Sequence, residues 1–94
     1  MNLDKIRHVM PHRIRVFRYA KGWTQERLAE AANIHPTYIS RIESGQKIPT
    51  LYVICAISDT LGIHTYELFV DDAKIHSHDY KKRKLMHIVN ESST

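Results

Sequence analysis

Apolar residues recur at three- and four-residue intervals along most of the chain, a spacing that predicts amphipathic α-helices. Pro11 disfavours helical backbone at the residue before it, so we expect the first main helix to begin near His12. Gly22 is suited to the left-handed residue that follows a helix C-terminus. The pattern therefore predicts a first helix between His12 and Gly22.

Two short helices are predicted between residues 24 and 45. Thr24 is a good N-cap for the first of them, and Asn33, which tolerates a left-handed backbone, follows its end. Pro36 suits the first turn of the next helix, and Gly45 closes that helix. Their buried stripes consist of the apolar residues Leu28, Ala29, Ala32, Ile39 and Ile42.

A fourth helix is predicted from the N-cap Thr50 to Gly62. Its buried stripe keeps the 3.6-residue period through Leu51, Ile54, Ile57, Ser58 and Leu61. A last short turn carries Leu68 and Phe69. Five short helices with short links predict an all-α bundle, and the sequence has no β-hairpin signal.

The pattern divides the chain into three parts. The bundle is expected to occupy residues 12–70, after an N-terminal extension of residues 1–11 in which Leu3, Ile6 and Val9 are spaced for an extra turn or helix. Residues 71–94 form a C-terminal extension, within which residues 78–90 place apolar positions beside a Lys-Lys-Arg-Lys run. That arrangement is typical of an amphipathic helix.

The distribution of charge changes the picture of the first helix. The 94 residues contain 14 Lys and Arg against 10 Asp and Glu, a net charge of +4 that is compatible with a polyanionic partner. Between residues 1 and 27, seven basic residues face two acidic ones. Among them, Arg13, Arg15 and Lys21 are expected to reach solvent. An ordinary solvated helix face is the alternative interpretation of this charge excess.

Composition excludes several classes of protein. A chain of 94 residues forms one small domain, and its one cysteine, Cys55, allows no intramolecular disulfide, which favours a cytoplasmic location. No apolar run approaches the roughly 18 residues of a membrane span. Asp4, Lys5 and Arg7 interrupt the segment in which a signal peptide would be apolar. We therefore expect no association with a membrane.

The sequence does not indicate catalytic chemistry. His76, His78 and His87 have no Cys, Asp or Glu at a recognisable ligand spacing, so no metal and no cofactor are predicted. Paired carboxylates, a phosphate loop and a nucleophile–base–acid arrangement are also missing from the sequence pattern. We expect a binding protein and not an enzyme.

The most specific signal is the two-helix unit from Thr24 to Glu43. Two helices that cross steeply at a short turn need a small residue where they touch, and Ala29 supplies it. The second helix then has a free outer face, which is the geometry that enters a DNA major groove. That face carries hydrogen-bonding side chains and no acidic one: Thr37, Tyr38, Ser40, Arg41 and Ser44.

The run TQERLAEAANIHPTYISRIESGQKIPTLYVICAISDTLGIHTYELF, residues 24–69, resembles the Cro-repressor-type (xenobiotic-response-element) helix-turn-helix family. Within the family it is most similar to small dimeric regulators such as restriction–modification controller proteins. The resemblance implies a five-helix Cro/lambda-repressor-like DNA-binding bundle, to which residues 71–94 add a C-terminal helical extension.

The resemblance also assigns roles to individual residues. Gln25, at a helix N-terminus, is expected to anchor a phosphate. Recognition-helix positions that meet bases or adjacent phosphates are filled by Pro36, Thr37, Ser40 and Arg41. Positions that contact flanking phosphates are filled by Tyr38, Ser44 and Lys47. His35 stands where a Ser or Asp N-cap is usual, and Pro36 can meet a base only through an apolar contact.

Two further sets of residues have structural roles under this resemblance. Arg18 and Glu43 occupy positions that form an ion pair between the first and third helices. The expected homodimer uses the fourth and fifth helices, with Ile63, Tyr66 and Phe69 as anchors.

Two functions are compatible with these residues. The first is a transcriptional regulator that binds double-stranded DNA in a sequence-specific way, as a homodimer on a palindromic operator. The second is an antitoxin-like protein-interaction module, in which residues 71–94 bind a partner protein and the helix-turn-helix only autoregulates.

Overall fold

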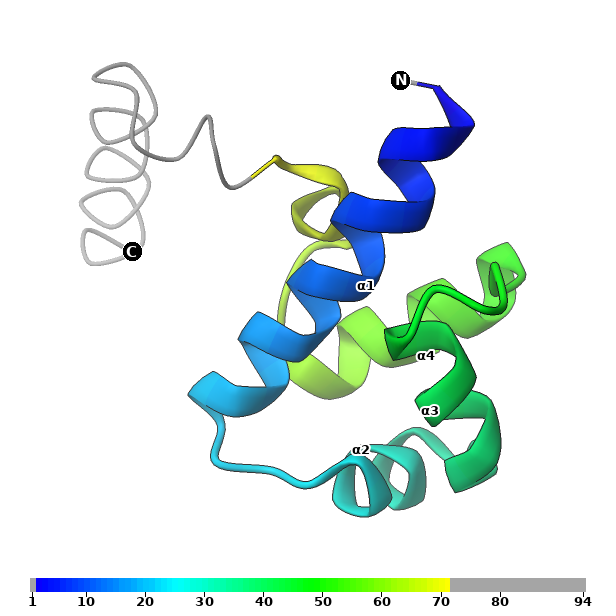
Figure 1. The fold of residues 1–94 in the computed structure, drawn as a ribbon. Helices are drawn as coiled ribbons and strands as arrows, with labels where there is room; N and C mark the ends of the chain where they lie inside the picture. Colours follow the sequence, from blue (N-terminus) through cyan, green and yellow to red (C-terminus); the bar gives the residue numbers. More distant parts are fainter. Residues whose placement is uncertain (1, 72–94) are drawn as a thin grey trace, which may run out of the picture.

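Four α-helices and one short 3₁₀ helix make up residues 2–71, the part of the chain that the computed structural model describes (Figure 1). In chain order they are α1 (Leu3–Ala20), α2 (Gln25–Ala32), α3 (Pro36–Glu43), α4 (Leu51–Leu61) and η1 (Thr65–Phe69). No β-strand occurs within that range. The all-α class is therefore confirmed, and the fifth predicted helix is a 3₁₀ helix.

The predicted start of the first helix near His12 is wrong, because α1 begins at Leu3 and continues through Pro11. Proline within a helix removes one backbone hydrogen bond and costs about 3 kcal/mol or more. Met10 is completely buried and Pro11 is buried beside it. Burying a Met side chain contributes roughly 1.5–3 kcal/mol, which offsets much of that cost. The first turns of α1 thus belong to the packed bundle.

The ends of the inner helices follow the predicted capping residues. The Thr24 hydroxyl accepts a hydrogen bond from the Arg27 N–H at 3.0 Å, and Thr50 caps α4 in the same way. Asn33 follows α2 with φ 57°, in the left-handed region, and Gly62 follows α4 with φ 72°. These four caps confirm the predicted boundaries of α2 and α4 and fix the short connections between the helices.

The core draws on every helix: α1 packs against η1, α3 and α4, and α2 packs against α3 and α4 (Figure 1). Its fully or nearly fully buried apolar residues are Met10, Ile14, Leu28, Ala29, Ile39, Ile42, Ile54, Ile57, Leu61 and Leu68. Ala29 lies on α2, which packs on α3, as the predicted small contact residue requires. The packing holds α3 by its inner side and leaves its outer side uncovered. In residues 2–71 no helix is both long and apolar enough to cross a membrane.

Arg13 does not reach solvent as expected, because its side chain joins α1 to η1. Arg13 is 4% exposed, and its Nε donates a hydrogen bond to the Glu67 backbone oxygen at 3.0 Å. Its guanidinium also lies over the Phe17 ring, 4.7 Å from the centroid. The arginine satisfies its polar atoms on a backbone carbonyl while its stem packs in the bundle.

Trp23 lies in the turn between α1 and α2. The indole is half-buried and packs against the core. Lys21 Nζ lies 4.9 Å from the ring centroid and the Arg27 guanidinium 5.0 Å from it. Cation–π attraction therefore places two positive charges beside the turn.

Replacing Met10 by Ala is expected to lower the free energy of unfolding by roughly 2–5 kcal/mol, because it leaves a cavity in the core. Leu3→Ala is the matched control: Leu3 is 65% exposed, so a change within about 0.5 kcal/mol is expected. Urea denaturation followed by circular dichroism measures both. Equally small losses for the two variants would show that the start of α1 is not packed on the bundle.

Candidate nucleic-acid interface

α3 presents two chemically different sides. Ile39, Ile42 and Glu43 are buried on its inner side. The exposed residues of α3, all of them described, are Pro36, Thr37, Ser40 and Arg41. The exposed side of this helix therefore carries hydroxyl groups and a guanidinium, and its one carboxylate is turned inward.

The N-terminus of α3 is capped by a histidine. The Nδ1 atom of His35 accepts a hydrogen bond from the Thr37 N–H at 3.1 Å. His35 thus takes the place of the Ser or Asp that is usual at this position, and Pro36 fills the first helical position, where its missing N–H costs nothing. The cap fixes the direction in which α3 leaves the turn.

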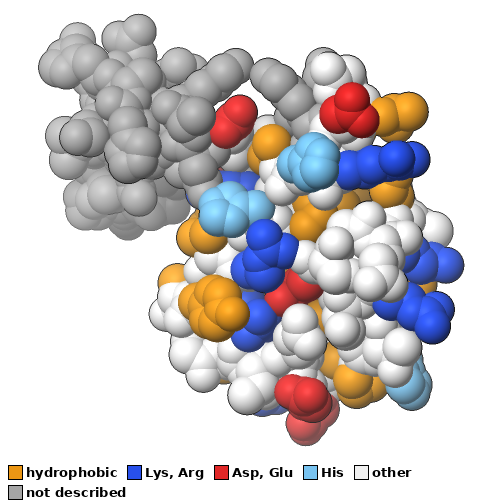
Figure 2. Space-filling model, in the orientation of Figure 1, with side chains coloured by type: hydrophobic (Ala, Val, Ile, Leu, Met, Phe, Trp, Pro, Cys, Tyr) orange, Lys and Arg blue, Asp and Glu red, His pale blue; other side chains and the backbone are white. Residues whose placement is uncertain are grey.

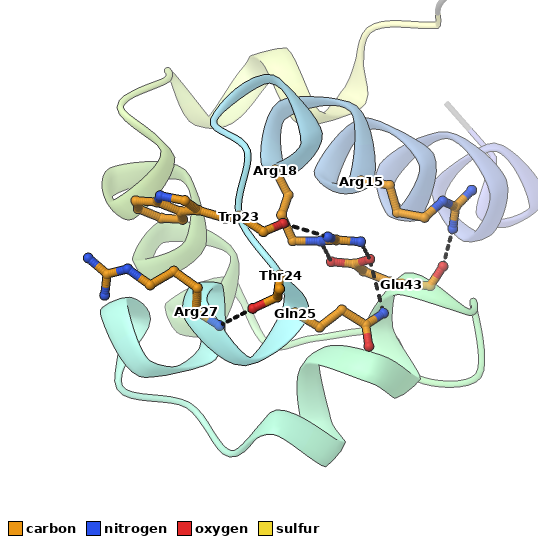
Figure 3. Close-up of polar contacts among 7 residues, drawn as sticks. All are labelled: Arg15, Arg18, Trp23, Thr24, Gln25, Arg27 and Glu43. Atoms are coloured by element: carbon orange, nitrogen blue, oxygen red, sulfur yellow. Dashed lines mark hydrogen bonds and ion pairs between the residues drawn. The ribbon is translucent and has the colours of Figure 1, made fainter.

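A buried ion pair joins α1 to the end of α3 (Figure 3). Arg18 Nε lies 2.8 Å from Glu43 Oε2, and Arg18 Nη2 lies 2.8 Å from Glu43 Oε1. The residues are 5% and 2% exposed, and a third Arg18 nitrogen donates to the Trp23 carbonyl at 2.8 Å. Hydrogen bonding to Glu43 raises the pKa of Arg18, so the guanidinium keeps its charge despite burial. The pair that the resemblance predicts is present, and it neutralises the carboxylate of α3.

Gln25 is linked to the same carboxylate. It is the first residue of α2, and its Nε2 donates to Glu43 Oε1 at 3.2 Å (Figure 3). Its side chain is half-buried and is held toward the end of α3. The start of α2 and the end of α3 are therefore connected through one buried carboxylate.

The remaining predicted contact residues lie on α3 and just after it. Tyr38 is half-buried, and Lys47 Nζ lies 5.3 Å from the centroid of its ring. Ser44 is exposed, and its hydroxyl donates to the Arg41 carbonyl at 3.1 Å. The Lys47 backbone N–H bonds to the same carbonyl at 3.2 Å, so the chain folds back around the end of α3. The structure thus gathers all eight predicted residues around α3 and the start of α2.

Arg15 has a position that its sequence pattern did not reveal. The sequence places it in solvent, but it is half-buried and donates to the backbone oxygen of Glu43, the last residue of α3 (Figure 3). A cation at a helix C-terminus is stabilising because it faces the negative end of the helix dipole. The available signal was its spacing from Arg18: residues three apart share one helix face, and that face is predicted to meet α3.

The predicted dimer residues lie on η1 and in the turn before it. Tyr66 is 63% exposed and stacks on His64, with ring centroids 5.6 Å apart. Ile63 and Phe69 are half-buried and pack against the core. Only Tyr66 of the three therefore presents most of its surface.

Some sequence predictions lie outside the described residues. They are the amphipathic helix over residues 78–90, the partner-binding segment 71–94 beyond its first residue, and the histidines His76, His78 and His87. Within residues 2–71, the structure shows no group of three or more His, Cys, Asp or Glu side chains that could hold a metal ion.

The sequence profile of the helix-turn-helix family matches residues 14–68 of the chain. The chain therefore belongs to the helix-turn-helix family, and the predicted Cro-repressor type is confirmed. Its class is that of DNA-binding transcriptional regulators, which are not enzymes.

Individual relatives agree with this assignment. The chain is 41% identical over 56 residues to the uncharacterized HTH-type transcriptional regulator YazB of Bacillus subtilis, and the match covers 60% of this chain and 81% of YazB. It is 34% identical over 65 residues to a hypothetical transcription factor of Neisseria meningitidis, covering 69% of this chain and 61% of that protein.

Solved structures show the same fold. The crystal structure of the Neisseria transcription factor superposes with a TM-score of 0.71 at 32% identity, over 73% of this chain and 79% of that one. The restriction–modification controller protein C.AhdI of Aeromonas hydrophila superposes with a TM-score of 0.65 at 32% identity, over 72% of this chain and 100% of that one.

Replacing Glu43 by Gln is expected to lower the free energy of unfolding by roughly 3–5 kcal/mol, because Arg18 then stays buried without its counter-charge. The double variant Arg18→Met with Glu43→Leu is expected to be more stable than Glu43→Gln, since it removes both charges and keeps apolar volume. Guanidinium denaturation measures both variants. A loss below about 1 kcal/mol for Glu43→Gln would contradict a structural role for the pair.

Proposed function

We propose that the chain is a sequence-specific regulator that binds double-stranded DNA as a homodimer on a palindromic operator. The observation that carries the proposal is the exposed side of α3, where Thr37, Ser40 and Arg41 stand free of any carboxylate. An α-helix with its side chains is about 10–12 Å in diameter, which matches a major groove about 12 Å wide.

Base contacts fall to the exposed side of α3. Arg41 can give two parallel hydrogen bonds to the O6 and N7 atoms of guanine. The hydroxyl groups of Thr37 and Ser40 can donate or accept at base edges or at adjacent phosphates. Pro36 has no N–H to donate, so its contact is apolar, with a thymine methyl group as the fitting partner.

Phosphate contacts fall to the residues at the rim of α3. Gln25 lies at the N-terminus of α2, where backbone N–H groups and the helix dipole favour an anion. Ser44 and Lys47 are exposed after the end of α3, and Tyr38 supports the Lys47 ammonium with its ring. Because Arg18 neutralises Glu43, the buried carboxylate does not repel the phosphates of the DNA backbone.

The dimer places two copies of α3 in successive major grooves, about 34 Å apart, on one side of the duplex. Tyr66 on η1 supplies an exposed aromatic side chain for the contact between copies. Exposed aromatic residues are frequent anchors of protein interfaces because they bury a large area with few rotatable bonds. The two half-sites are expected to be palindromic, since the protein contact is two-fold symmetric.

Replacing Arg41 by Ala is expected to weaken binding by about 1–3 kcal/mol at each half-site of the preferred duplex and to relax the preference at one base pair there. Lys47→Ala is the matched variant: it removes one exposed cation that is assigned to a phosphate, so it should weaken all duplexes alike and keep the preference. Selection of bound duplexes from a random pool gives the preferred site, and titration then measures both variants. Unchanged affinity and preference for Arg41→Ala would remove the base-contact assignment.

Replacing Tyr66 by Glu is expected to shift the protein from dimer to monomer, because a charge would be buried at the proposed contact. Leu3→Glu is the control, since Leu3 is 65% exposed on α1, a helix that is not assigned to the contact. Sedimentation equilibrium at micromolar concentrations measures the mass of each. A monomeric unmodified protein at high micromolar concentration would contradict the homodimer.

A further inference from the structure

A surface hollow of about 100 Å³ lies between the first half of α1 and the C-terminal end of α3. Two arginines of α1 line it, together with a histidine, a proline and the chain at the end of α3. The full set is Arg7, His8, Pro11, Arg15, Glu43, Ser44 and Gly45. The sequence pattern predicts no site here, because it places the start of the packed domain at His12.

The hollow is positively charged. Among the residues that line it, the one acidic side chain is Glu43, and Arg18 bonds to both of its carboxylate oxygens. The charges of Arg7 and Arg15 are therefore not offset within the lining. Arg15 donates one hydrogen bond to the Glu43 backbone oxygen. Because a guanidinium has five N–H donors, further donors remain for a ligand.

The two sides of the hollow are fixed relative to each other. Gly45 has φ +80°, and a Cβ built on it would lie 3.4 Å from the backbone oxygen of Arg7. That oxygen is the one to which Pro11 cannot donate a helical hydrogen bond. Arg15 adds a second link, from α1 to the last carbonyl of α3. The start of α1 is thus held against the loop that follows α3.

The hollow continues the proposed DNA-binding surface. Ser44 belongs to both, since it lines the hollow and is also assigned to a phosphate. In Figure 2, Lys and Arg side chains form an upper and a lower group on the right-hand edge of the described surface. The upper group lies near the first turns of α1 and the lower group lies beside α3. A duplex that follows α3 would therefore pass this second basic group.

We propose that the hollow binds a phosphate group of the DNA backbone next to the groove that α3 enters, with Arg7 and Arg15 as its ligands. The proposal rests on the proposed DNA-binding function. The planar fork of a guanidinium matches two oxygens of one phosphate, and charge-assisted hydrogen bonds of this kind are about twice as strong as neutral ones. The N-terminal turns of α1 thereby add a phosphate contact that the helix-turn-helix unit does not contain.

Arg7→Gln tests the proposal because Arg7 is exposed and the substitution keeps a helix-forming residue. The selected duplex is ethylated at single phosphates, and binding of each product is compared between the unmodified protein and the variant. We expect one phosphate per half-site whose ethylation weakens the unmodified protein and has no effect on Arg7→Gln. On intact duplex the homodimeric variant loses two phosphate contacts, one in each half-site, so it should bind about sixtyfold more weakly at 0.1 M salt.

Two matched variants make the result specific. Lys21→Gln removes the same charge at the other end of α1, outside the hollow, and should keep the sensitivity to ethylation at that phosphate. Arg7→Lys keeps the charge without the fork and should restore part of the affinity. Identical ethylation patterns for Arg7→Gln and the unmodified protein would overturn the proposal.

A free anion is the other source of the same chemistry. If the hollow serves a free phosphate alone, inorganic phosphate binds the unmodified protein more tightly than Arg7→Gln, while both proteins bind intact duplex equally well. That pair of results would assign the hollow to a free phosphate and overturn the DNA contact. Failure of the DNA-binding function itself looks different, because the unmodified protein would then select no duplex from the random pool.

Discussion

The arrangement of this domain depends on one buried ion pair. Arg18 on α1 bonds with two nitrogens to both carboxylate oxygens of Glu43, and its third nitrogen holds the Trp23 carbonyl of the following turn. Gln25, at the start of α2, bonds to the same carboxylate. Three helices therefore meet at one charged group, so the orientation of α3 against α1 and the approach of α2 are determined together.

Burying this pair is not a simple gain in stability. Two charges lose their water shells, and their attraction repays that cost only when the geometry is good and the remaining polar atoms are satisfied. Here every buried side-chain N or O atom in the described residues has a hydrogen-bond partner. Glu43 lies on the helix whose opposite side is exposed for recognition, so the pair also keeps a carboxylate on that helix from acting on a polyanion. The Arg18–Glu43 contact therefore both orients α3 and neutralises its carboxylate.

Much of the fold is predictable because its signals are local. Thr24, Asn33 and Gly62 cap helices through contacts within a few residues, and such contacts are written directly in the sequence. The prediction fails at Pro11 because the local cost of proline is offset by the burial of Met10, which depends on the whole bundle. It fails at Arg13 and Arg15 for the same reason: their partners are backbone carbonyls on η1 and at the end of α3, far along the chain. A carbonyl oxygen has no identity in a sequence pattern, so the spacing of Arg15 from Arg18 could indicate the helix face but not the acceptor of either bond.

The position of Trp23 has a practical consequence. It is the sole tryptophan of the chain and lies in the turn between α1 and α2, beside two cations, with its carbonyl tied to the buried arginine. Its indole emission is therefore a built-in optical probe of that turn, separable from the five tyrosines by exciting at the red edge of the absorption band. Loosening of the junction between the first two helices can be followed in unlabelled protein, without adding a dye to a surface that must stay free.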